Sequence, residues 1–283
     1  MSTYYKPNRK PDWNYGGPKW RLSRSKIDLF IQCQRCFYVD NKLGTARPPG
    51  FPFNLNSAVD KLLKKEFDIH RANGTTHPLM KSYGLDTVPF QDPRMDVWRE
   101  NFKGVEVKHE PTGFTVSGAV DDIWVNPSGE VHVVDYKATS KDTEVTLDAE
   151  WQDGYKRQME IYQWLLRRNG LKVSSTGYFV YVNGRTDLEA FDGKLEFDVK
   201  LIPYTGNDGW VEKTLLDIKA CLDSETIPKV GNECDYCTYR EAAGKALAAQ
   251  HMKTAKPSAP VKKPPVKKES DPGEASSPTA SLF

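Results

Sequence analysis

The spacing of apolar residues along the chain predicts a mixed α/β protein. In four segments these residues recur at helical spacing; in five others they alternate or run as β-branched residues, which is typical of strands. The predicted helices cover residues 25–41, 56–72, 148–169 and 210–224. The predicted strands cover residues 104–110, 114–125, 131–138, 175–184 and 195–204. The order helix, three antiparallel strands, helix, strand favours one α/β core with a mixed sheet and extra helices at both ends.

Local signals refine these boundaries. Serines before Ile27 are expected to cap the first helix, and Asn56 is expected to cap the second. A connector without a predicted element then runs to about Glu100. The sequence Asn-Pro-Ser-Gly at 126–129 is typical of a tight turn between two neighbouring strands. A last helix is expected to follow Cys237.

The ends of the chain differ in composition from its body. Residues 1–22 are rich in Tyr, Pro, Trp and Lys and are expected to form an irregular basic arm. Residues 252–283 hold Lys-Pro runs and few apolar side chains, so we expect a disordered tail. A single domain is then predicted over residues 23–251. Residues 1–26 carry a net charge of +6 and residues 253–283 carry +3, so the body is acidic although the whole chain is +2. Such a body contacts a polyanion through local basic patches or metal ions.

Several protein classes are excluded or disfavoured. The 283-residue chain has no run of about 18 apolar residues, which argues against a membrane span. Its first residues lack the apolar stretch of a secretory signal, so a cytoplasmic protein is expected. In that setting five cysteines favour metal or thiol chemistry over a disulfide framework. No phosphate-binding glycine motif indicates nucleotide-driven activity.

The most informative chemistry lies in residues 118–140. Asp121 closes an apolar stretch, and Asp135 and Lys137 end the next strand. Because Asp135 and Lys137 are two positions apart, they point to the same side of the sheet, and Tyr136 points to the other. The turn between the strands can bring the two aspartates together. Buried carboxylates are unfavourable unless a cation lies between them, and hard oxygen ligands suit Mg²⁺ or Mn²⁺. The pattern therefore favours metal-assisted phosphodiester hydrolysis, with a set of solvated strand ends as the alternative.

Three motifs carry a family resemblance: GAVD at 118–121, VVDYK at 133–137, and the Gln158–Tyr162 segment QMEIY. Together they resemble the PD-(D/E)XK nuclease superfamily, in particular its RecB-like branch, which includes CRISPR-associated RecB-like exonucleases and the AddB nuclease domain. The predicted element order is similar to the αβββαβ restriction-endonuclease-like core of that superfamily. The resemblance covers roughly residues 20–245 and implies a Mg²⁺- or Mn²⁺-dependent deoxyribonuclease.

The resemblance also implies roles for individual residues. Asp121 and Asp135 match the metal-binding aspartates, and the backbone carbonyl of Tyr136 matches a third ligand. Lys137 matches the catalytic lysine, which orients the attacking water or helps to deprotonate it. Asp122 is not expected to be a ligand, because on an extended strand it faces away from Asp121.

Two further helices contribute candidates. Gln158 and Tyr162 match residues that contact substrate or steady the lysine. The first helix of the family often carries a metal-binding histidine in a GxxxH pattern, and here Asp60 holds that place. An aspartate can also bind Mg²⁺ or Mn²⁺. Glu66 on the same helix is another candidate acid. A first-turn acid favoured by the helix dipole remains the alternative for Asp60.

Four of the five cysteines form two CxxC pairs far apart in the sequence. They are Cys33, Cys36, Cys234 and Cys237. Four thiolates in this arrangement indicate a tetrahedral zinc or an iron–sulfur site that joins the two ends of the domain. The fifth cysteine, Cys221, lies in an apolar helix and is expected to pack as a core thiol.

The resemblance bears on the metal at this site. RecB-like nucleases often hold an iron–sulfur cluster with one cysteine in the first helix and three near the C-terminus. The third C-terminal cysteine would fall near Ala243, where this chain has none, and Cys36 can supply the fourth ligand instead. An iron–sulfur cluster and Zn²⁺ therefore both remain open.

The leading hypothesis is a RecB-like exonuclease that processes DNA ends in repair, recombination or CRISPR adaptation. Its partners would be single-stranded or double-stranded DNA, with a helicase or a recombination or CRISPR protein in a larger assembly, and no membrane. The alternative hypothesis is a catalytically silent module that binds nucleic acid or acts as a scaffold, with a structural four-cysteine metal site.

Overall fold

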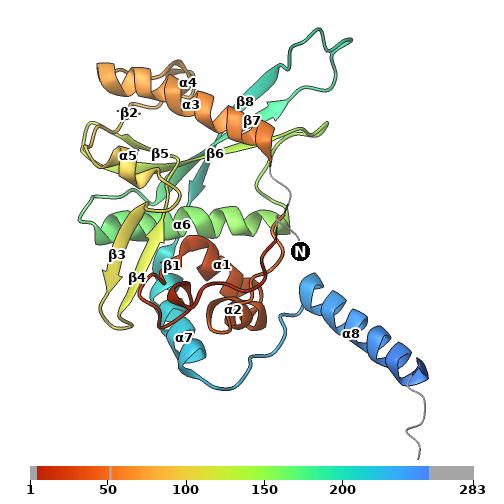
Figure 1. Ribbon diagram of the computed structural model, residues 1–283. Coiled ribbons are helices and arrows are strands. Elements are labelled where there is room, and N and C mark those ends of the chain that lie inside the picture. Colours follow the sequence, from red (N-terminus) through yellow and green to blue (C-terminus); the bar gives the residue numbers. More distant parts are fainter. Residues whose placement is uncertain (1–4, 51–52, 255–283) are drawn as a thin grey trace, which may run out of the picture. The chain divides into compact units, whose positions relative to one another are not determined.

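The structure is a computed structural model that describes residues 5–50 and 53–254 (Figure 1). The chain divides into two units, residues 1–238 and residues 239–283. All strands that the structure describes lie in the first unit. In the second unit, the described residues continue helix α8 (Asp235–Thr254). Apart from 252–254, which close α8, the expected tail over 252–283 lies outside the described residues.

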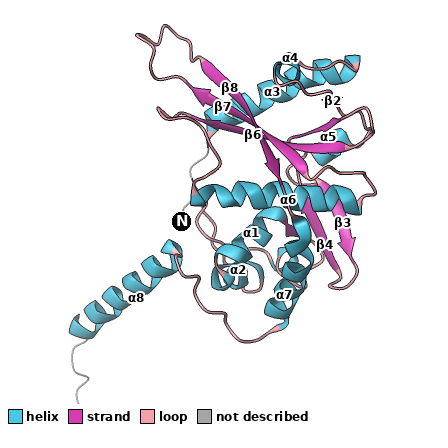
Figure 2. Cartoon of the chain, turned by 180° about the vertical axis from the view of Figure 1, so that it is seen from behind, coloured by secondary structure: helices cyan, strands magenta, loops and turns pink. Residues whose placement is uncertain are grey.

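The strands form two sheets (Figure 2). The larger sheet has the order β2 (Val88–Pro89), β5 (Asp122–Val125), β6 (Val131–Thr139), β7 (Thr176–Gly184) and β8 (Phe197–Thr205). Within it, β6 and β7 are parallel and the other neighbours are antiparallel. The smaller sheet has the order β1 (Leu22–Ser23), β4 (Phe114–Gly118) and β3 (Val105–His109). This architecture confirms the prediction of a mixed α/β fold.

The strand predicted over 114–125 is in fact two strands in two different sheets. The chain leaves the smaller sheet after Gly118 and enters the larger sheet at Asp122. Between them, the N–H of Val120 bonds to the carbonyl of Trp98 at 3.1 Å instead of to a strand neighbour. The apolar run is continuous because both strands are buried, so hydrophobicity alone does not reveal the break. Asp121 lies at this break.

The predicted connector before Glu100 also contains short elements. These are α4 (Pro78–Ser82), β2 and α5 (Met95–Trp98). The longer helices are α1 (Arg24–Gln32), α2 (Gln34–Asn41), α3 (Asn54–Asn73), α6 (Asp153–Arg168) and α7 (Val211–Asp223). Single 3₁₀ turns cover Pro11–Trp13, Glu150–Gln152 and Asp208–Trp210. Among the described helices, none combines the length and apolar character that a bilayer crossing requires.

Several helix boundaries differ from prediction. The helix expected over 148–169 begins only at Asp153, after a 3₁₀ turn. The helix expected over 25–41 breaks at Cys33, whose extended backbone lets its sulfur accept the N–H of Cys36 and cap α2. Asn56 lies inside α3 rather than at its cap, and its side chain donates to the carbonyl of Ala138 at 2.9 Å. The last helix begins at Asp235 and therefore includes Cys237 rather than following it.

The larger sheet is covered on both faces, by α6 on one and α3 on the other (Figures 1 and 2). Strand alternation sorts the residues of β6 between the two cores. Val133 packs in the cluster that contains Ile161 of α6, whereas Val134 and Tyr136 pack with Phe67 of α3. Asp135 and Lys137 follow Val133 at a period of two, so they emerge on the α6 face.

The described N-terminal residues before β1 have little regular structure but pack against the rest of the first unit. The ring of Trp20 lies 5.2 Å from those of Tyr15 and Phe114, edge to face in both pairs. Arg9 forms an ion pair with Asp40 of α2. These contacts hold the described part of the basic segment against the core.

Candidate active site and cysteine centre

Asp121 and Asp135 meet where β5 and β6 pair. Asp122 lies opposite Val134 in the antiparallel register, which sets Asp121 beside Asp135. The Asp121 Oδ2 atom accepts the backbone N–H of Tyr136 at 3.0 Å. The break between β4 and β5 thus gives Asp121 a fixed place at the end of the hairpin.

Asp135 is the most deeply buried acid of this group, with no exposed side-chain surface, and it forms an ion pair with Lys137. Burial raises the pKa of Asp135 to about 6; the ammonium of Lys137 opposes this rise and the charge of Asp121 adds to it. A raised pKa means that the neighbouring positive charges do not fully offset the cost of burying the ionised carboxylate. The position therefore favours a bound cation.

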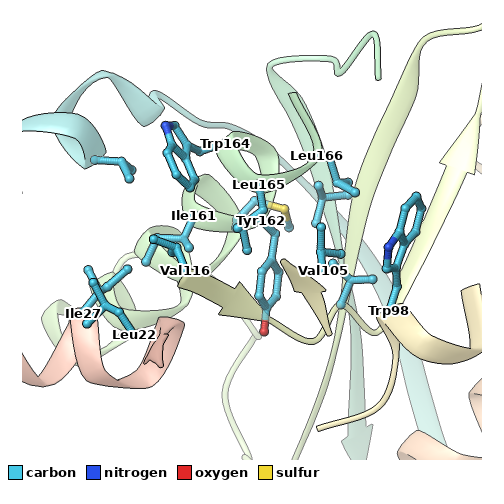
Figure 3. Close-up of a cluster of buried hydrophobic side chains, with 14 of the residues drawn as sticks. Leu22, Ile27, Trp98, Val105, Val116, Ile161, Tyr162, Trp164, Leu165 and Leu166 are labelled. Atoms are coloured by element: carbon cyan, nitrogen blue, oxygen red, sulfur yellow. The ribbon is translucent and has the colours of Figure 1, made fainter. Parts of the chain in front are cut away.

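Helix α6 supplies the next contacts to Asp135. The amide Nε2 of Gln158 donates to Asp135 Oδ1 at 2.7 Å and lies 3.1 Å from the hydroxyl of Tyr162, one helical turn away. Tyr162 directs this hydroxyl out of the hydrophobic cluster around Leu165 (Figure 3). A Cβ at Gly118 would lie 2.7 Å from the Tyr162 ring, so the close approach requires glycine. The contact of the Gln158 amide is therefore with Asp135 and not with the lysine.

The ammonium of Lys137 has an aromatic neighbour as well as its acid. Its Nζ lies 4.5 Å from the ring centroid of Tyr155, on the first turn of α6. The ion pair and this cation–π contact together place Lys137 beside Asp135. The two residues were expected to end their strand, but β6 continues to Thr139 and both lie inside it.

Two basic residues that sequence reasoning missed also reach the acids. Burial lowers the pKa of Arg24, but the neighbouring Tyr162 and Asp135 outweigh this effect and raise it. Lys64 lies 2.8 Å from Asp60 and 3.3 Å from Asp121. The spacing of four between Asp60 and Lys64 predicts their ion pair, but no local spacing relates Arg24 or Lys64 to the hairpin.

Asp60 therefore lies in the same charge group as Asp121. Burial raises its pKa; Lys64 counteracts this rise and Asp121 reinforces it. Glu66 is not brought to the group: its carboxylate is 57% exposed and contacts His77 Nε2 at 2.9 Å. Six helix positions separate Asp60 from Glu66, so the two point to different sides of α3.

Asp122 has a structural environment on the opposite face. It is fully buried and forms ion pairs with Arg71 and Arg99, the latter at 3.0 Å. It also accepts the hydroxyl of Tyr136 at 2.7 Å. Asp122 thus faces away from Asp121, and its charge is satisfied by two arginines.

The residues fit a divalent cation as an open site. Carboxylate and carbonyl oxygens are the ligands that Mg²⁺ prefers, and it commonly takes one or two carboxylates together with water and substrate oxygens. Over the described ranges, the acids do not form a closed set: only the four cysteines bring three or more candidate ligand atoms within 4.8 Å of one another. Asp121 and Asp135 therefore supply part of a coordination shell.

The cysteine centre is closed and buried. The Sγ atom of Cys36 lies 3.6 Å from that of Cys234 and 3.5 Å from that of Cys237. The Sγ atoms of Cys33 and Cys237 are 3.9 Å apart. None of the four is in a disulfide. Because these cysteines come from the α1–α2 junction and the start of α8, a metal here ties the first helices to the end of the first unit.

Backbone and arginine donors surround these sulfurs. The N–H of Gly231 donates to Cys33 at 3.3 Å, and Arg47 donates to Cys234 at 3.2 Å. Burial raises the pKa of Cys33, but backbone donors outweigh it and lower the pKa to about 6. Burial and neighbouring sulfurs raise the pKa of Cys237. Cys221 lies outside the cluster and packs against the main core.

Comparisons with known proteins give a solved structure of low similarity and a family match. A solved structure described as the crystal structure of SSO0001 has 15% sequence identity and a TM-score of 0.38; the match covers 78% of this chain and 84% of that chain. No curated protein matches the chain. Residues 90–242, more than half of the chain, match the model of the PD-(D/E)XK nuclease superfamily. The chain therefore belongs to the PD-(D/E)XK nuclease superfamily.

Proposed function

We propose that this protein is a Mg²⁺- or Mn²⁺-dependent deoxyribonuclease of the RecB-like type. The observation that carries the proposal is the buried Asp135, which lies beside Asp121 and forms an ion pair with Lys137. Both acids and the lysine meet where β5 begins beside the middle of β6, and Gln158 fixes Asp135 from the neighbouring helix. Superfamily membership supports the same chemistry.

The residues would divide the work as follows. Asp121, Asp135 and the carbonyl of Tyr136 would hold the cation, with Asp60 as a further acid on the same side. The bound ion stabilises negative charge on the phosphate and lowers the pKa of a bound water. Lys137 would orient this water, or accept its proton once the ammonium has released its own. Gln158 holds Asp135 in the orientation that presents its second oxygen to Lys137.

The RecB-like resemblance favours exonucleolytic cleavage at DNA ends, in repair, recombination or CRISPR adaptation. In such pathways a helicase or a recombination or CRISPR protein would deliver the strand. The acidic body is compatible with this substrate, because metal ions and local basic patches can carry the phosphate contacts.

For the cysteine centre, we infer a single tetrahedral ion, Zn²⁺, rather than an iron–sulfur cluster. A zinc–sulfur bond of about 2.3 Å sets tetrahedral sulfur atoms about 3.8 Å apart. Three of the six sulfur–sulfur distances, at 3.5, 3.6 and 3.9 Å, are close to that spacing, and all four sulfurs lie within 4.8 Å of one another. A cluster places several iron atoms among its cysteines and requires wider separations. Elemental analysis giving one zinc per chain, without visible absorption, is the expected result; a brown protein would contradict it.

A second candidate function, a catalytically silent nucleic-acid-binding module, has one observation in its favour. Lys64 lies between Asp60 and Asp121, and Lys137 contacts Asp135, so lysines already supply part of the charge that the acids require. Such a site can stay folded without an ion.

The deciding experiment is a nuclease assay on end-labelled single-stranded and double-stranded DNA with Mn²⁺, Mg²⁺, Ca²⁺ or EDTA. Lys137→Ala and Asp135→Ala are each expected to lose at least about 100-fold in rate, because the lysine acts on the water and the acid holds the ion. Lys156→Ala is the matched control, since Lys156 lies on α6 but pairs with Asp153.

The products separate an exonuclease from an endonuclease, because end-labelled DNA gives different ladders with each. If the zinc-loaded wild type binds DNA but never cuts it with any cation, the silent-module function replaces the nuclease. If Lys137→Ala cuts at the wild-type rate, the assigned role of the lysine is wrong.

A further inference from the structure

An exposed tryptophan lies close to the candidate catalytic lysine. Trp151, in the 3₁₀ turn before α6, is 57% exposed. Its ring centroid lies 5.5 Å from that of Tyr155, and the rings meet edge to face. Tyr155 in turn contacts the ammonium of Lys137. Trp151 is therefore separated from the acid–lysine group by a single aromatic ring.

Trp151 also lines a cavity of about 430 Å³, together with Tyr236. This volume is in the range of small-ligand pockets. Arg47 stacks on the ring of Tyr236, with its guanidinium 4.5 Å from the centroid. Arg157, the other arginine of the lining, forms an ion pair with Asp28. The cavity thus contains two aromatic rings. Both arginines of its lining already have partners within the protein.

The charge of the lining discriminates between parts of a nucleotide. Glu150, Glu233 and Asp235 also line the cavity. Three carboxylates disfavour a phosphate group at this place, whereas they can accept hydrogen bonds from the amino groups of a base. Positive charge lies next to the cavity instead: Lys141 Nζ is 5.1 Å from the Trp151 ring. Together with Lys137, it offers cations for backbone phosphates on the side of the active site.

We propose that this cavity binds an unpaired nucleobase of the substrate strand, stacked on Trp151, while the adjoining phosphates lie toward Lys141 and Lys137. The inference rests on the proposed function and specifies its substrate class. A base inside a duplex has both faces stacked on its neighbours, so only a single strand or a frayed end can offer a base to the cavity. The substrate is therefore single-stranded DNA or an unpaired DNA end.

A thermodynamic cycle of binding affinities tests the proposal without cleavage. It removes the Trp151 side chain and one base of the strand, first separately and then together; coupling means that the two losses are not additive. A fluorescein-labelled twelve-nucleotide single strand is titrated with the zinc-loaded protein in Ca²⁺, and a single abasic position is moved along the strand. In the wild type, one abasic position is expected to weaken binding by about fivefold or more, as loss of one stacked base does. Trp151→Ala should weaken binding of the intact strand by a similar factor and show no further loss at that position.

Phe191→Ala is the matched control, because Phe191 is an aromatic residue, 71% exposed, in the loop between β7 and β8. This variant should keep the wild-type affinity and the wild-type abasic profile, and Trp151→Phe should restore part of the binding. The proposal is overturned if Trp151→Ala and Phe191→Ala bind alike, or if the abasic profile of Trp151→Ala equals that of the wild type.

The result can be separated from that of the nuclease assay. If the wild type cleaves DNA with Mn²⁺ but the cycle shows no coupling, the cavity assignment alone fails. If the cycle shows coupling but no cation supports cleavage, base binding stands and the proposed hydrolysis fails.

Discussion

The two candidate metal centres balance their charges in opposite ways. In the carboxylate group, the protein supplies its own cations: Lys64 contacts Asp60 and Asp121, and Lys137 contacts Asp135. In the cysteine centre, four sulfurs face one another across distances as short as 3.5 Å. There a single arginine, Arg47, donates to a sulfur among the described residues.

This difference separates an exchangeable site from a permanent one. An open site whose acids have lysine partners can remain folded while its ion and substrate come and go. A closed set of four sulfurs has no vacant position for substrate, which is typical of structural metal sites. The same fold thus holds one centre suited to chemistry and another suited to joining its ends.

The largest expected effect tests the permanent site. Cys234→Ser should abolish metal binding and lower the free energy of unfolding by more than about 4 kcal/mol, because losing a structural metal is among the most destabilising changes. Elemental analysis and urea unfolding measure both quantities. Cys221→Ser, outside the cluster, should retain the metal. Full stability of Cys234→Ser would show that the cluster does not hold the fold together.

A smaller effect concerns Asp135 in protein without added Mg²⁺ or Mn²⁺. Because burial raises its pKa from 3.8 to about 6, the folded state binds this proton more tightly than the unfolded state. The stability contributed by this group is therefore complete below pH 4 and is lost as the pH rises through 6.

Asp135→Asn cannot ionise and should avoid that loss. It should match the wild type near pH 4 and exceed its stability at pH 8 by up to about 3 kcal/mol, measured by urea unfolding at both pH values. The same variant should bind Mn²⁺ poorly. Equal dependence of stability on pH in the two proteins would show that burial does not raise the pKa of Asp135.

The smallest expected effect concerns Lys64. An ammonium that pairs with Asp60 and Asp121 competes with a metal ion for the same acids. Lys64→Met should therefore tighten Mn²⁺ binding by about fivefold or less, the scale of one partly exposed ion pair. Calorimetric titration measures this affinity, with the exposed neighbour changed in Lys65→Met as control. Weaker binding by Lys64→Met would mean that the lysine positions the acids for the ion instead.

The sequence predicted the elements of the core more accurately than the boundaries between them. Alternation and helical spacing located the strands and the long helices, but the buried run over 114–125 concealed a change of sheet at Asp121. The helix break at Cys33 was also missed, because helical spacing continues across it, whereas the extended backbone of Cys33 ends α1 and its sulfur caps α2.

For the site, the sequence by itself determined the short-range pairs. A spacing of two sets Asp135 and Lys137 on one side of a strand, and a spacing of four sets Gln158 and Tyr162 on one side of α6. These relations follow from backbone geometry alone. The CxxC spacing likewise brings cysteines together in pairs.

Only the tertiary structure decided what each pair meets. It brought Lys64 to the acids, left Glu66 with His77, and placed Trp151 and Tyr236 around one cavity. Such contacts depend on how buried faces pack across the whole core, and no local periodicity encodes them. The physical reason is that backbone geometry sets the direction of a side chain, whereas its partner is set by long-range packing.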